Sequence, residues 1–216
     1  INLIERGAML YFRNSLIASL STVIVATVLG TMAGYGLARG EFHRKKQIAW
    51  WIITTRMAPI VAVLLPLFQI FKTIGLPNTI PGLVLGFTLF SLPFAIWMMM
   101  GFFREIPEEL EEAAWVDGAT KAQSFWYIAL PMVKPGLVAT AVLCFVFAWN
   151  DYLFATVLTS GTTQTLPVVT AALQTMRGIL WGQVMSMGTL IFVPVLIMGI
   201  AIRKYLVRGL TMDAIK

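Results

Sequence analysis

Residues 112–118 read Glu-Ala-Ala-Trp-Val-Asp-Gly, and after nine further residues positions 128–131 read Ile-Ala-Leu-Pro. This stretch is polar, acidic at its start and rich in helix-forming residues, yet a long apolar segment flanks it on each side. A protein this hydrophobic has little physical reason to keep such a segment in water unless another protein docks there. The stretch therefore predicts a docking site between two membrane spans.

The rest of the chain is apolar enough to belong in a bilayer. Of its 216 residues, 58% are hydrophobic and only 12% are charged, whereas a soluble domain carries about 25% charged residues. A membrane span needs about 20 mainly apolar residues. Such segments lie at residues 15–38, 48–71, 80–103, 135–158 and 184–202. We therefore expect one all-α domain over residues 1–216, a polytopic membrane helical bundle with five transmembrane helices.

The basic residues predict which loops face the cytoplasm. Eleven of the 16 lysines and arginines lie in loops 39–47 and 104–134 or in the tail 203–216, and four lie in the alternate segments. The positive-inside rule then places those two loops and the tail in the cytoplasm. Residues 1–14, 72–79 and 159–183 are expected outside. This distribution also explains the net charge of +6 without a nucleic-acid partner.

The segment 104–134 carries signals for two short helices. Pro107 suits a first helical turn, and the four glutamates that follow it favour the positive end of the helix dipole. Gly118 permits the left-handed turn that ends a helix. Thr120 and Gln123 have capping-box spacing for a second helix, which closes near Pro131. An interfacial pair that merely connects two spans is the alternative, but an acidic helix matches an anionic leaflet poorly.

Glycines and prolines predict how the spans pack and bend. The pairs Gly30 and Gly34, and Gly82 and Gly86, have the spacing that lets helix backbones approach closely. Proline removes a helical hydrogen bond, so we expect kinks or local unwinding at four positions. These are Pro59, Pro66, Pro93 and Pro194.

The sequence lacks the residues that ATP binding, a His/Cys metal site or intramembrane catalysis would need. No Gly-Lys dipeptide occurs, so there is no phosphate-binding loop for ATP. With one histidine, His43, and one cysteine, Cys144, the sequence offers no His/Cys metal cage, and no cofactor is expected. Only Arg56 and Asp151 are ionisable inside spans. An intramembrane enzyme therefore has no support.

The spacing Glu-Ala-Ala, three residues, Gly, nine residues, Ile-x-Leu-Pro resembles the cytoplasmic coupling loop of permease subunits in binding-protein-dependent ABC importers. The likeness extends over nearly the whole chain and is nearest to the carbohydrate importers of the maltose-transporter type. Three further stretches carry it: Phe147-Ala-Trp-Asn-Asp-Tyr152, Thr165-Leu-Pro167 and Lys204-Tyr-Leu-Val-Arg-Gly-Leu-Thr211.

This resemblance implies a non-catalytic subunit that forms half of a sugar pathway by alternating access in a bacterial or archaeal cytoplasmic membrane. The implied partners are an ATPase subunit dimer, a second permease subunit, an extracytoplasmic sugar-binding protein and the lipid bilayer. The family has one more helix upstream, and we expect that helix to be missing from this sequence. The implied ATPase-coupling residues are Glu112, Ala113, Ala114, Asp117, Gly118, Leu130 and Pro131.

A polar cluster near the outer end of the fourth span is a candidate for the sugar path. A rise of about 1.5 Å per residue puts Trp149, Asn150 and Asp151 in the outer part of the membrane. Sugar hydroxyls need donors and acceptors, and a pyranose face stacks on an indole. One alternative is an interfacial anchor, because Trp and Tyr concentrate at the membrane surface. The other is that the partner permease holds the sugar. Arg56 is expected to lie deep in its span, where a structural contact is favoured over a role in gating or substrate binding.

A stand-alone channel or secondary transporter is the competing hypothesis for the whole chain. That hypothesis does not explain why the chain has the acidic segment, and the sequence has no obvious ion-coupling site beyond Asp151. The sequence does not identify the sugar.

Overall fold

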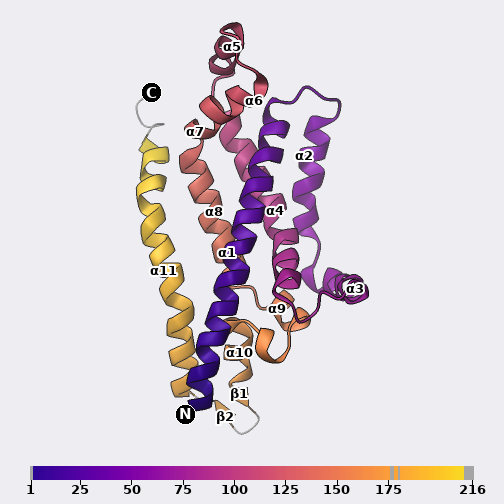
Figure 1. Ribbon diagram of the computed structural model, residues 1–216, viewed down its shortest axis with the longest axis vertical. Coiled ribbons are helices and arrows are strands. Elements are labelled where there is room, and N and C mark those ends of the chain that lie inside the picture. The colour runs from indigo at the N-terminus through magenta and orange to yellow at the C-terminus, as the bar shows by residue number, and fades with distance from the viewer. Residues whose placement is uncertain (1, 176–177, 180, 212–216) are drawn as a thin grey trace.

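The computed structural model describes residues 2–175, 178–179 and 181–211, and it is almost entirely helical (Figure 1). The long helices are α1 (Asn2–Arg39), α4 (Ile80–Arg104), α8 (Lys134–Trp149) and α11 (Trp181–Thr211). The shorter helices are α2 (Lys45–Thr54), α3 (Ile60–Thr73), α5 (Glu109–Val116), α6 (Lys121–Ser124), α7 (Leu130–Met132), α9 (Leu153–Leu158) and α10 (Leu166–Ala172). Three short segments belong to other helix types. The segments η1 (Thr55–Met57) and η3 (Gly161–Thr163) are 3₁₀-helical, and η2 (Phe125–Ala129) is π-helical. Strands β1 (Gln174–Thr175) and β2 (Gly178–Ile179) form a two-residue antiparallel pair. The predicted all-α class is confirmed.

Within the described residues, three helices are long and apolar enough to cross a membrane: Gly7–Arg39, Ile80–Arg104 and Trp181–Ile200. Two further segments qualify only as bent pairs, Lys45–Met57 with Ile60–Thr73 and Lys121–Met132 with Lys134–Trp149. The predicted number of five spans is therefore reached when each bent pair counts as one.

One predicted span boundary is wrong. The fourth span does not continue to residue 158, because α8 ends at Trp149 and the short helix α9 starts only at Leu153. The segment predicted as one helical fourth span is therefore the helix α8, a break and the short helix α9. Residues 2–14, expected outside the membrane before the first span, are helical and continue into the rest of α1 without a break.

Proline explains the sharpest bend. The helices on either side of Ala58 and Pro59 differ in direction by 95°. Ala58 is extended, with φ −62° and ψ 133°, as steric contact with a following proline ring favours. The break predicted at Pro59 is therefore confirmed. Pro66, Pro93 and Pro194 instead lie inside α3, α4 and α11, which continue past them.

Close contact between α1 and α4 forms the centre of the bundle. A Cβ atom added at Gly30 would lie 2.6 Å from the Cβ of Ala95, and one at Gly34 would lie 2.8 Å from the backbone nitrogen of Met100. The close approach predicted for Gly30 and Gly34 is therefore confirmed. Gly82 and Gly86 differ from the prediction, since Gly82 abuts the carbonyl of Leu76 in its own entry turn and Gly86 faces side chains of α9.

The two ends of the molecule group the loops as the charge pattern predicts. Figure 1 shows the α1–α2 connection, α5, α6 and the carboxyl end of α11 at one end, and α10 with the β pair at the other. Side chains of α1 hold the second end together. Asn14 Nδ2 donates to the carbonyl oxygens of Thr162 and Gln164, at 2.8 and 3.1 Å, and the N–H of Leu166 donates to Ser15 Oγ at 2.8 Å. Of the predicted tail 203–216, residues 203–211 continue α11, whereas 212–216 lie outside the described residues.

Candidate coupling segment and membrane cavity

The acidic helix α5 forms as the sequence predicts. Three glutamates occupy its first turn, where the N–H groups have no helical partner and the dipole favours negative charge. The helix ends at Val116 with Asp117 as its C-cap, and Gly118 follows with φ 91°. A residue with a Cβ atom rarely adopts this angle, so glycine is needed to turn the chain.

The second predicted helix begins with a complete capping box. The N–H of Gln123 donates to Thr120 Oγ1 at 3.2 Å, while the N–H of Thr120 donates to Gln123 Oε1 at 2.8 Å. Elements α6, η2 and α7 then follow without interruption to Met132. The Leu130 N–H donates to the Phe125 carbonyl, which makes a π-helical turn just before Pro131, and the chain then bends by 73° into α8.

The predicted coupling residues form two groups by exposure. Glu112, Ala113, Asp117 and Gly118 are exposed, whereas Ala114, Leu130 and Pro131 are half-buried. Sequence reasoning missed the large apolar side chains that surround them at the surface. Val116 is 88% exposed, and Leu110, Trp115, Trp126 and Tyr127 are also exposed. Exposed large apolar residues that gather on a small helix pair are typical of a surface that another protein covers.

Glu111, next to the predicted coupling residues, is only 1% exposed. Its carboxylate accepts from Arg39 Nε at 2.6 Å, from the Tyr35 hydroxyl at 2.5 Å and from the Ser124 hydroxyl at 3.3 Å. Arg39 also donates to the carbonyl of Ile106 at 2.7 Å. These bonds attach α5 and α6 to the end of α1. The acidic run 108–112 gave no sign that one of its glutamates is buried.

Trp149 is buried inside the protein. It is 1% exposed, its ring stacks on Phe145 and meets Phe12 edge-on, and its indole Nε1 donates to the carbonyl of Ile191 at 3.0 Å. Trp149 thus fixes the end of α8 against α11.

The break after Trp149 gives its two polar neighbours separate positions. Asn150 is exposed, and its amide donates to the Val146 carbonyl at 2.8 Å. Asp151 Oδ1 accepts from the N–H groups of Phe154 and Ala155, at 3.0 and 3.3 Å. Asp151 therefore satisfies the free donors at the start of α9, as an aspartate at a helix entry does.

A cavity of about 340 Å³ brings Asn150 and Asp151 together with Arg56. The Arg56 guanidinium lies 4.8 Å from the ring centre of Phe147 and 5.2 Å from that of Phe94. These rings are the contact that the sequence did not reveal, and a cation over an aromatic face is attracted by its electron density. Among the described residues, no three His, Cys, Asp or Glu side chains lie close enough to hold a metal ion.

Comparison with known proteins identifies the family of this helical bundle. Residues 8–212 match the family described as the binding-protein-dependent transport system inner membrane component. The chain belongs to this family. It is a membrane transport subunit, and such systems employ a binding protein and a separate ATPase. The stand-alone channel or secondary transporter is therefore not supported.

The permease has relatives over most of its length. It is 38% identical over 208 residues to the trehalose transport system permease protein SugB of Mycobacterium tuberculosis, covering 94% of this chain and 75% of the relative. It is 32% identical to the trehalose/maltose transport system permease protein MalG of Thermococcus litoralis, covering 95% and 75%. It is 33% identical to the diacetylchitobiose uptake system permease protein DasC of Streptomyces coelicolor, also covering 95% and 75%.

Solved structures share the fold. A chain of the inward-facing MetNI methionine ABC transporter superimposes with a TM-score of 0.75 at 18% identity, covering 96% of this permease and 95% of that chain. A chain of a bacterial ABC transporter for the polysaccharide alginate gives 0.67 at 22% identity, covering 97% and 76%. At these identities the likeness concerns architecture alone.

Proposed function

We propose that this permease forms half of the translocation pathway of an ATP-driven importer of sugars, such as oligosaccharides, disaccharides or polyols. Relatives named for trehalose, maltose and diacetylchitobiose support this substrate class. A second permease subunit completes the pathway, and an extracytoplasmic sugar-binding protein delivers the substrate. The pathway opens alternately to the two sides of the membrane as the ATPase dimer closes and opens.

The observation that carries the proposal is the position of α5. Its face with Glu112 and Ala113 is open to a partner, whereas the neighbouring Glu111 is locked to Arg39 at the end of α1. A surface that moves with the bundle is what an ATPase needs in order to drive a conformational change. Asp117, Gly118, Leu130 and Pro131 shape the turn and the second helix, and Ala114 keeps the contact face thin.

We place the sugar at the cavity that Arg56, Asn150 and Asp151 line. Their amide, carboxylate and guanidinium groups supply donors and acceptors for hydroxyls, and the Phe147 ring supplies an apolar face. Trp149 contributes indirectly by fixing the end of α8, from which Asn150 follows.

The test is sugar uptake by the permease reconstituted with its ATPase, partner permease and binding protein. Trehalose and maltose are the first sugars to test. Asn150→Ala should weaken apparent affinity for the sugar by about five- to a hundredfold, since a bound sugar hydroxyl left without its hydrogen-bond partner costs roughly 1–3 kcal/mol. Trp149→Ala should reduce uptake at least as strongly, through loosening of α8.

Asp151 needs a matched pair of variants because it also caps α9. Asp151→Asn keeps an acceptor for the N–H groups of Phe154 and Ala155, whereas Asp151→Ala removes it. If the carboxylate serves the sugar, both variants lose uptake while basal ATP hydrolysis survives. Normal uptake by Asn150→Ala and Asp151→Asn would place the sugar in the partner subunit. Absence of uptake of every sugar by the intact complex would refute the substrate class itself.

A further inference from the structure

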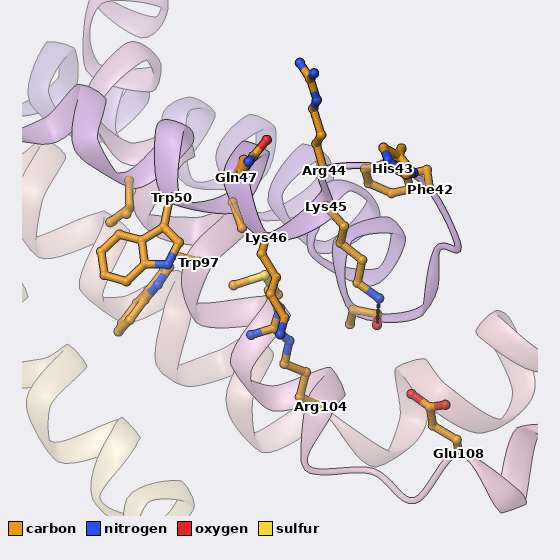
Figure 2. Close-up of a pocket in the computed structure, with 14 residues that line it drawn as sticks. Phe42, His43, Arg44, Lys45, Lys46, Gln47, Trp50, Trp97, Arg104 and Glu108 are labelled. Carbon is orange, nitrogen blue, oxygen red and sulfur yellow. Dashed lines mark hydrogen bonds between the residues drawn. The ribbon is translucent and has the colours of Figure 1, made fainter.

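A second and larger cavity lies between the start of α2 and the end of α4, at the end of the molecule that carries the coupling segment (Figure 2). Its volume is about 950 Å³. Its lining includes one carboxylate, that of Glu108, and four basic residues: Arg44, Lys45, Lys46 and Arg104. The cavity is therefore strongly positive.

The charges at this cavity are only partly neutralised by the protein. Glu108 already accepts from Arg39 at 3.3 Å, and Lys45 Nζ donates to the carbonyl of Ala38 at 2.7 Å. Within the part of the chain that the structure describes, Lys46 and Arg104 form no salt bridge. Figure 2 shows Lys46 from α2 and Arg104 from α4 pointing toward one another. Two like charges that converge on one space favour an anion between them.

The same cavity has an apolar wall that a small anion does not need. Trp50 is 71% exposed and Trp97 is 48% exposed, and both line the cavity on the side away from Glu108 (Figure 2). Tryptophan concentrates where the membrane meets water. A ligand that pairs with the basic residues and also packs against the two tryptophans has a negative head group and hydrocarbon chains.

We propose that this cavity binds an anionic phospholipid of the cytoplasmic leaflet, with its phosphate between Lys46 and Arg104 and its acyl chains along Trp50 and Trp97. Basic pockets between membrane helices on the cytoplasmic side recognise such head groups. The site is independent of the sugar pathway. It adjoins the coupling segment, because Glu108 at its rim contacts the same Arg39 that holds Glu111.

The test uses the permease purified with its partner subunits and reconstituted in phosphatidylcholine vesicles. Increasing fractions of dibrominated phosphatidylglycerol are added, since bromine quenches nearby tryptophan fluorescence. We expect more quenching than with dibrominated phosphatidylcholine at equal fraction. The excess should disappear in Trp50→Phe/Trp97→Phe. A juxtamembrane charge is worth about 1 kcal/mol, or about fivefold, so Lys46→Gln/Arg104→Gln should lower the preference for phosphatidylglycerol about thirtyfold.

Two control variants separate specific loss from general damage. Lys72→Gln removes an exposed basic residue at the end of α3 and should leave the preference unchanged. Lys46→Arg/Arg104→Lys keeps both charges and should also retain it. Undiminished preference in the glutamine pair would overturn the proposal. So would displacement of the lipid by inorganic phosphate, or loss of the ATPase from the glutamine pair in pure phosphatidylcholine, which would make the cavity an ATPase contact.

Discussion

At the scale of single residues, Glu111 and Glu112 are neighbours in one short helix with opposite environments. Glu111 is buried against Arg39, Tyr35 and Ser124, whereas Glu112 faces solvent. A buried carboxylate is tolerated only when its charge is compensated and its oxygens are hydrogen-bonded. Glu111 meets both conditions, and it therefore fixes the face of α5 that remains free for a partner.

Replacing Glu111 should consequently destabilise the subunit. Glu111→Ala removes the buried partner of Arg39 and leaves it the exposed Glu108, at 3.3 Å, as counter-charge. Breaking a buried ion pair costs about 3–5 kcal/mol. The thermal midpoint of the detergent-purified complex should fall, and ATPase stimulation should fall with it. Glu109→Ala is the matched control on the same helix, because Glu109 is exposed, and it should change stability by less than about 0.5 kcal/mol. Equal midpoints for the two variants would contradict the structural role of Glu111.

The Arg39–Glu111 contact also shows a limit of sequence reasoning. The two residues are separated by 72 positions, and four neighbouring glutamates in the acidic run look equally solvated in the sequence. Arg56 presents the same difficulty. Its depth in an apolar segment predicts that it needs a partner, but two phenylalanine rings carry no charge that would identify them.

At the scale of elements, local chemistry made the two helices of the segment 104–134 and the bend at Pro59 predictable. The capping box at Thr120, the positive φ at Gly118 and the break at Pro59 each depend on a few adjacent residues. The end of α8 is also set by nearby residues, but hydropathy does not reveal it. Apolar residues continue beyond Asn150, and the helix stops at Trp149 while Asp151 binds the N–H groups of the next turn. A hydropathy window cannot detect a break that polar capping creates inside an apolar run.

The coupling segment should fail when either its turn or its surface is changed. Proline cannot adopt the φ of 91° at Gly118, so Gly118→Pro should misplace α6 relative to α5. Glu112→Lys/Ala113→Asp should reverse the charge and alter the shape of the exposed face. Both variants should insert into the membrane but lose at least about 90% of ATP-driven uptake, a loss equivalent to about 1.4 kcal/mol or more of coupling.

Uptake and membrane insertion are measured side by side for these variants. Gly101→Ala is the control for glycine replacement, because a Cβ atom at that helical position meets nothing within 4 Å. Uptake at the normal rate by either coupling variant would show that α5 is not the element through which the ATPase acts.

At the scale of the whole molecule, a continuous set of contacts links the coupling segment to the bundle. Glu111 joins α5 to α1 through Arg39, and α1 then packs backbone-close against α4 at Gly30 and Gly34. At the far end, Asn14 and Ser15 of the same helix hold the segment 162–166. Because close-packed interiors transmit displacement rather than absorb it, we expect α1 to carry movement of α5 along the length of the subunit.

If α1 carries this movement across the membrane, α5 and the segment 162–166 must lie on opposite sides of it. Cysteine labelling can establish this. The natural Cys144 is fully buried, so background labelling should be low. Val116→Cys and Thr162→Cys each place a thiol at an exposed position. A membrane-impermeant maleimide should label Val116→Cys only in inside-out vesicles and Thr162→Cys only in right-side-out vesicles, each with at least about a tenfold preference. Stripping the ATPase should raise labelling at Val116→Cys alone, because α5 then loses its partner. Labelling of both positions from one side would rule out α1 as a connection between the two faces of the membrane.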